Sequence, residues 1–208
     1  DITLPEGQLK LLRKVAAVND HIAVVLFGGR PVDLREVKEL AKAILVVWMP
    51  GTEGGNAIAD VLFGDEMPQG RLSMCLPRTV AQAPIYYNQF RTGRPNHTGT
   101  RVGFVNGYID ESTFPLYSFG YGLTYTEFEY SPVSLDKTEV VKGADVIAKT
   151  VIRNVGKYVG TETVQLYVQD VKGSVVRPVK MLRGIMKVTL QPGESEEVAF
   201  VIKEDMLK

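Results

Sequence analysis

The feature that most constrains the fold is a change of hydrophobic periodicity along the chain. In the first part, the continuous apolar runs at residues 22–27 and 43–49 lie between segments with helical spacing of apolar residues. Such runs are typical of strands buried on both faces, and their alternation with helices indicates a parallel sheet. The expected helical faces are Leu9, Leu12, Val15 and Ala16, and then Leu34, Val37 and Ala41. This part of the sequence predicts about half of an α/β domain.

Local signals predict where the helices begin and end. Thr3 followed by Glu6 has the spacing of a capping box, so the first helix is expected to have Thr3 as its N-cap. In "PGTEGGNAIADVLFG" (residues 50–64), Thr52 is expected to cap a third helix and Gly64 to end it.

Beyond residue 130 the period of the apolar residues becomes two. Residues 144–152, 162–170 and 196–203 alternate in the way that half-buried strands do, with turn signals such as "QPGES" between them. This pattern indicates an antiparallel β-sandwich, which usually has about seven strands. Fewer are found before Lys208, and the chain starts at Asp1 without a Met, so we expect it to be cut from a longer protein at both ends.

Residues 77–125 have no strong period but are rich in Pro, Gly, Tyr, Phe and Arg. Solvated linkers contain few aromatic residues, and long unstructured loops are uncommon in compact domains. We therefore predict a strap that packs on a domain surface through aromatic rings. The expected anchors are Tyr117, Phe119, Tyr121 and Tyr125.

Charge and apolar content exclude several classes of partner. Lys plus Arg and Asp plus Glu number 24 each, so there is no excess of positive charge for nucleic acid. The longest apolar runs are much shorter than the roughly 20 residues that span a bilayer, so no membrane partner is expected. Cys75 is the single cysteine, and its apolar neighbours predict a buried, inert thiol.

Glu53, in "GTEGG" at an expected strand-to-helix turn, is the most tempting catalytic acid. A proton donor needs a raised pKa, whereas a helix N-terminus lowers the pKa of a carboxyl group. Glu53 is therefore interpreted as structural, and no catalytic residue is assigned. The glycines match no phosphate or dinucleotide motif, and His21 and His97 are too few for a metal site, so neither cofactor nor metal is expected.

Several long motifs, in order along the chain, carry a resemblance to a known family. They are "PGTEGGNAIADVLFGDEMPQGRLSMCLPR" (50–78), "PIYYN" (84–88), "TGRP" (92–95), "PLYSFGYGLTYTEF" (115–128) and "VRPVK" (176–180). With these motifs the sequence resembles the C-terminal part of glycoside hydrolase family 3, the β-glucosidase and β-xylosidase family, and in particular its bacterial periplasmic type.

The resemblance implies a fold of the α/β plus all-β class. Residues 1–76 match the C-terminal part of an α/β sandwich, 77–127 a connecting strap, and 128–208 a fibronectin type III-like β-sandwich that is incomplete at its C-terminal end. The family's TIM-like barrel, with the aspartate nucleophile, lies upstream, and its glutamate acid/base shortly precedes the segment matching "DITLP". Both catalytic carboxyls are therefore expected outside this chain.

The resemblance also implies a function. The parent protein is expected to be a retaining, exo-acting hydrolase that removes terminal non-reducing β-D-glucosyl residues from β-glucosides or oligosaccharides, in the periplasm or after secretion. Its expected partners are the substrate and the upstream barrel, and a homodimer is considered too. The alternative is a noncatalytic carbohydrate-binding or interaction module, which would have no use for the α/β part.

Residues that suit a sugar site lie in the strap. Sugar sites combine apolar ring faces with hydrogen-bonding edges, and "YYNQFRTGRP" and "TRVGFVNGYIDE" contain both. Structural packing of the strap is the competing interpretation. The candidates for the rim of the leaving-group subsite are Asn88, Arg101 and Tyr108.

Overall fold

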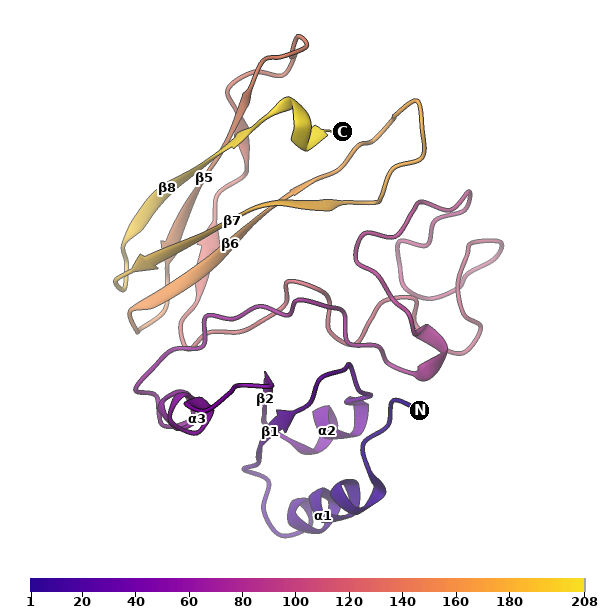
Figure 1. Cartoon of the computed structure of the whole chain (residues 1–208), viewed down its shortest axis with the longest axis vertical. Helices are drawn as coiled ribbons and strands as arrows, with labels where there is room; N and C mark the ends of the chain where they lie inside the picture. Colours follow the sequence, from indigo (N-terminus) through magenta and orange to yellow (C-terminus); the bar gives the residue numbers. More distant parts are fainter. Residues whose placement is uncertain (208) are drawn as a thin grey trace. The chain divides into compact units, whose positions relative to one another are not determined.

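The computed structural model describes residues 1–207, which form two compact units (Figure 1). The first unit comprises residues 1–63, 72–87 and 92–121, and the second comprises residues 64–71, 88–91 and the chain from 122 onward. The strap therefore contributes segments to both units.

The first unit contains the predicted α/β elements. In chain order they are α1 (Glu6–Ala16), β1 (Ala23–Phe27), α2 (Arg35–Leu40), β2 (Ala43–Trp48) and α3 (Gly54–Phe63). The two strands pair in parallel, with Leu26 opposite Val46. Helices α1 and α2 are joined by Arg13, whose Nε and Nη2 donate to the two carboxylate oxygens of Glu36 at 2.5 and 2.9 Å.

The core of the first unit includes residues from the strap. Leu34 and Val37 of the α2 region are buried together with Leu76 and Leu116. Residues 72–76 and 116–121 run side by side in antiparallel fashion: the Leu76 N–H donates to the Tyr117 carbonyl at 2.8 Å, and the Leu116 N–H donates to the Leu76 carbonyl at 2.9 Å. The segment just before the strap and the C-terminal part of the strap are therefore fixed to each other within this unit.

The ends of the helices agree only partly with the sequence prediction. The capping box is wrong, because α1 has Pro5 at its N-cap and no side-chain cap, while the Thr3 hydroxyl donates to Asp1 Oδ1 at 2.8 Å. The Glu6 carboxylate instead accepts from Arg13. The predicted end of α3 is confirmed, since Gly64 follows Phe63 with a φ of 86°, a left-handed conformation that glycine adopts easily.

The second unit is built from antiparallel strands. They are β3 (Phe128–Tyr130), β4 (Ser134–Leu135), β5 (Val146–Asn154), β6 (Gly160–Val168), β7 (Met181–Leu190) and β8 (Ser195–Ile202). Strand β5 pairs with β3, β4 and β8, while β6 pairs with β7 in a second sheet (Figure 1). Short 3-10 helices lie at Val80–Gln82 in the first unit and at Glu204–Leu207 in the second.

The core of the second unit lies between its two sheets. Ile152 of β5 and Val198 of β8 are buried in one cluster with Val164 of β6 and with Val188 and Leu190 of β7. Val146, Ala148 and Ile202 are buried as well, so β5 and β8 have the buried face that the alternation in residues 144–152 and 196–203 predicts. The fold is thus α/β plus a β-sandwich, as the sequence indicated.

Residues 64–71 precede the strap but pack on the β-sandwich. The Thr163 hydroxyl of β6 donates to the Gln69 carbonyl at 2.8 Å, and Lys187 of β7 donates to Gln69 Oε1 at 3.1 Å. Arg71 forms an ion pair with Glu162 of β6 at 2.7 Å, with both side chains nearly buried. This short segment is therefore an integral part of the second unit.

Candidate functional site

The aromatic rings of the strap are anchored less uniformly than the sequence predicts. Tyr117 packs against the buried cluster that contains Leu34 and Leu116. Phe119 stacks on Tyr87 with ring centroids 4.0 Å apart. Tyr121 and Tyr125, however, are 43% and 46% exposed, so these two predicted anchors are only half-buried. Among the large apolar side chains of residues 115–125, the aliphatic Leu116 is the buried one, at 8% exposure.

A buried amide closes the base of the long loop formed by residues 92–114. Gln82 is 2% exposed, and its Oε1 accepts a hydrogen bond from the Arg78 N–H at 2.6 Å. Its Nε2 donates to the carbonyls of Ser112, at 2.5 Å, and Phe114, at 3.2 Å. All the polar groups of this side chain thus link the start of the strap to the end of the loop.

The loop itself is shaped by Asn96. Its Oδ1 accepts from the backbone N–H groups of Thr98 and Gly99, and its Nδ2 donates to the carbonyl of Thr100. These bonds form a compact turn, which explains how a segment without regular secondary structure keeps a defined shape.

Two of the predicted rim residues lie in this loop. The Tyr108 hydroxyl donates to the Ala81 carbonyl at 3.0 Å, and the ring remains 37% exposed. Arg101 is exposed, and its Cβ lies beside Gly107, the neighbour of Tyr108. The structure therefore brings Arg101 and the Tyr108 region together on one loop.

The third rim residue, Asn88, is exposed and belongs to the second unit. The residues that follow it are held by the connection between β6 and β7. The Gln89 carbonyl accepts from the Val179 N–H at 2.9 Å, Phe90 forms a bridge with Pro178, and Arg91 Nη1 donates to the Val171 carbonyl at 3.2 Å.

A network of charged residues connects the loop to α2. Arg35 binds Asp33 at 2.7 Å and Glu111 of the loop at 3.4 Å, and Arg78 lies 3.9 Å from Glu111. Burial acts to raise the pKa of Asp33, but the hydrogen bonds and charge of Arg35 outweigh it and lower the pKa below its ordinary value. Asp33 is thus a stable anion, suited to a structural role rather than to donating a proton.

Glu53 immediately precedes α3, and its Oε2 accepts from Asn56 at 2.8 Å in an exposed position. Within residues 1–207, no group of three or more His, Cys, Asp or Glu side chains is arranged to hold a metal ion. None of the helices in that range is long and apolar enough to cross a membrane.

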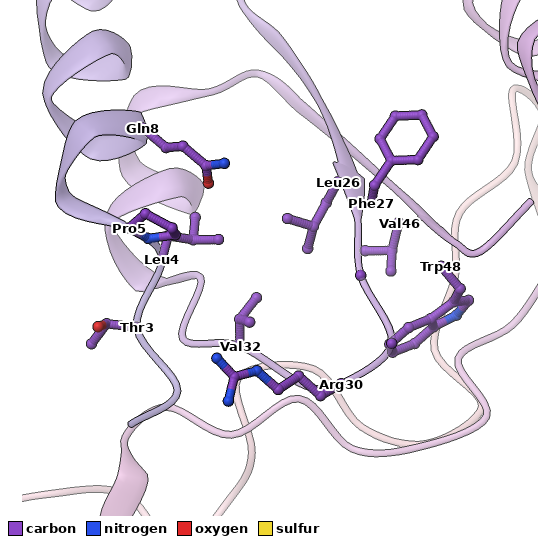
Figure 2. Close-up of a pocket in the computed structure, with 12 residues that line it drawn as sticks. Thr3, Leu4, Pro5, Gln8, Leu26, Phe27, Arg30, Val32, Val46 and Trp48 are labelled. Carbon is purple, nitrogen blue, oxygen red and sulfur yellow. The ribbon is translucent and has the colours of Figure 1, made fainter.

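A pocket of about 260 Å³ lies at the carboxyl ends of β1 and β2 (Figure 2). The strands contribute Leu26, Phe27, Val46 and Trp48, and the start of α1 contributes Pro5 and Gln8. The remaining lining residues are Thr3, Leu4, Gly28, Gly29, Arg30 and Val32. This edge of a parallel sheet is where α/β proteins commonly bind ligands.

Neither Gln82 nor the pocket was identified from the sequence. Gln82 stands in a polar, irregular stretch, and nothing in "TVAQAP" marks it as buried. The sequence does contain one feature that could have pointed to the pocket. Trp48 is the chain's single tryptophan and lies at the end of a continuous apolar run.

Comparison with known proteins decides the family. Residues 1–125 match the model of the glycosyl hydrolase family 3 C-terminal domain. The chain belongs to glycosyl hydrolase family 3. Residues 162–208 also match a fibronectin type III-like domain, in agreement with the β-sandwich of the second unit.

The similarity to individual members of family 3 extends over nearly the whole chain. It is 44% identical over 208 residues to a periplasmic β-glucosidase of Salmonella typhimurium, and 40% identical over 204 residues to the thermostable β-glucosidase B of Acetivibrio thermocellus. A crystal structure of a β-glucosidase from Listeria innocua with isofagomine superposes on 97% of this chain with a TM-score of 0.91 and 41% identity. The chain spans about a quarter of each relative, namely 27%, 27% and 28% of their lengths.

Proposed function

We propose that this chain is the C-terminal part of a retaining, exo-acting β-glucosidase that removes terminal non-reducing β-D-glucosyl residues. The observation that carries the proposal is the 44% identity, over all 208 residues, to a periplasmic β-glucosidase. The same relative supports a periplasmic or secreted location for the parent enzyme. The rival proposal, a noncatalytic binding module, does not account for an α/β unit that matches a hydrolase family.

The proposed role of this chain is to complete and support a catalytic site whose carboxyls lie elsewhere. A retaining glycosidase needs a nucleophile and a proton donor on opposite sides of the scissile bond. We assign neither role to an acid of this chain and place both in the upstream part of the parent, which includes a TIM-like barrel. The domain limits that we propose are 1–76, 77–127 and 128–208, and a homodimer is a further prediction.

We further propose that Asn88, Arg101 and Tyr108 border the leaving-group subsite of the parent enzyme. An amide, a guanidinium and a phenol ring together offer the hydrogen-bonding edges and the apolar face that sugar rings require. The Gln82 and Asn96 bonds support this role by giving the loop a fixed shape.

Hydrolysis of aryl β-D-glucosides tests the proposal. The parent enzyme is expected to release the aryl alcohol with retention of configuration, and an aryl β-D-xyloside measures its selectivity. The 208-residue chain alone is expected to be inactive. Turnover that follows the concentration of the purified chain would contradict our assignment of the catalytic carboxyls, and a parent without glycosidase activity would contradict the proposed function itself.

A further inference from the structure

The pocket at the carboxyl ends of β1 and β2 is lined by apolar and polar surface in about equal parts, with the aliphatic side chains grouped around Leu26 (Figure 2). Leu26 and Val46 project from the two strands, and Leu4, Pro5 and Val32 complete an aliphatic wall. The polar side chains that line it are Thr3, Gln8 and Arg30, and Arg30 is the only charged one. Pockets that combine an apolar wall with a few polar side chains are typical of small-molecule sites.

The polar part of the lining is rich in donors that the protein leaves unused. In the part of the chain that the structure describes, Arg30 has no acidic partner, and its recorded hydrogen bond runs from Nη1 to the Asp1 carbonyl at 3.2 Å. A guanidinium has five N–H donors, so most of them remain available. Since the Thr3 hydroxyl already donates to Asp1, the polar part of the lining offers a ligand mainly the Arg30 guanidinium and the Gln8 amide.

The backbone of Trp48, which lines this pocket, is strained. Its φ is 51°, a left-handed conformation that is unfavourable for a bulky residue and is found here at no other non-glycine position among residues 1–207. The strand register also shifts between Leu26 and Phe27, opposite this residue. Backbone strain of this kind persists where the surrounding structure enforces it, and it clusters at ligand sites.

We propose that this pocket binds a small carboxylate with an apolar body. The apolar body would lie against Leu26, Val32 and Val46, and the carboxylate would pair with Arg30, whose fork of donors matches the two oxygens. A neutral sugar ring fits less well, because it carries no negative charge to pair with the Arg30 guanidinium. The inference does not depend on the proposed glycosidase activity.

The chain offers a direct test, because Trp48 is its only tryptophan and lines the pocket. The 208-residue chain is titrated with phenylacetate, and the tryptophan fluorescence is recorded. Phenylacetamide, a neutral analogue of the same shape, serves as the matched ligand. The variant Arg30→Gln removes the positive charge, and Arg153→Gln removes an exposed charge from the second unit as a control.

We expect a saturable change in fluorescence with phenylacetate, at least about tenfold weaker binding in Arg30→Gln, and unchanged binding in Arg153→Gln. Phenylacetamide should bind about as weakly as phenylacetate does to Arg30→Gln. Circular dichroism and the thermal midpoint confirm that both variants are folded. The proposal is wrong if phenylacetate gives no saturable change, if Arg30→Gln binds it equally well, or if phenylacetamide or methyl β-D-glucoside binds more tightly.

Discussion

Arg71 and Glu162 form an ion pair from which water is almost completely excluded. The distance from Arg71 Nη2 to Glu162 Oε2 is 2.7 Å, and only 10% and 13% of the two side chains are exposed. The Tyr130 hydroxyl donates to the other carboxylate oxygen of Glu162 at 2.9 Å. The pair therefore joins three parts of the second unit: the segment 64–71, β3 and β6.

Removing one member of this pair should destabilise the second unit strongly. Arg71→Met leaves a buried carboxylate without its partner, and breaking a buried pair in this way costs roughly 3 to 5 kcal/mol. Urea unfolding followed by circular dichroism measures the loss. The matched control is Lys149→Met, since Lys149 and Glu197 form an exposed pair, with 43% and 55% of their side chains accessible, and such pairs contribute about 1 kcal/mol or less. Equal losses of unfolding free energy in both variants would show that burial does not strengthen the Arg71–Glu162 pair.

The same carboxylate should make the second unit sensitive to alkaline pH. Burial raises the pKa of the Tyr130 phenol above its ordinary value, and the charge and hydrogen bond of Glu162 raise it further. In the unfolded chain this phenol ionises near pH 10, so above that pH the unfolded state binds fewer protons than the folded state. The free energy of unfolding should therefore fall as the pH rises above about 10.

Tyr130→Phe isolates this contribution from the other groups that titrate in the same range. Compared with the wild type, the variant should be less stable at pH 7, because it lacks a hydrogen bond to a charged group, and its stability should fall less steeply above pH 10. Urea midpoints measured at intervals between pH 7 and 11 give the change of stability with pH for the wild type and for the variant. Parallel curves for the two proteins would rule out this origin of the pH dependence.

The sequence predicted five of the eight strands found in residues 1–207, and β7, the longest of the three that it missed, shows why such predictions fail. In β7 the alternation is hidden, because Ile185 faces outward and is 60% exposed although it is apolar. The pairing with β6 also shifts register, since Leu166 lies opposite Gly184 but Tyr167 lies opposite Leu182. An extra residue in one strand reverses the face of every later side chain, so a single period of two does not fit β7.

The candidate site was less accessible to sequence reasoning than the fold. Arg101 and Tyr108 were selected from composition, and the loop that holds them depends on contacts that are distant in sequence, such as Gln82 with Ser112. The pocket requires residues from α1, β1 and β2 to meet, which no local pattern encodes. Periodicity reports the burial of each element, but not which polar side chains meet across elements.

Gln82 should control the order of the 92–114 loop. Gln82→Leu keeps the size of the side chain but leaves the Arg78 N–H and the Ser112 carbonyl without their partner, at a cost of roughly 2 to 4 kcal/mol in total. Hydrogen exchange should become faster in the loop and stay unchanged in β5 and β8. Gln191→Leu, at an exposed turn, is the control and should alter neither. Unchanged exchange in the loop of Gln82→Leu would contradict this role of Gln82.

Leu116, rather than the exposed tyrosines, should provide most of the stability of the strap. It is 8% exposed and packs with Leu34, Val37 and Leu76, so Leu116→Ala should cost about 2 to 5 kcal/mol through lost burial and the cavity left behind. Tyr121 is 43% exposed, and its ring contact with Tyr117 is worth about 1.5 kcal/mol at most, which sets the expected cost of Tyr121→Ala. Leu123→Ala makes the same change as Leu116→Ala at a residue that is 70% exposed, and it should stay within about 0.5 kcal/mol of the wild type. Thermal and urea unfolding of the three variants give this ranking, and a loss in Tyr121→Ala as large as that in Leu116→Ala would return the anchoring role to the aromatic rings.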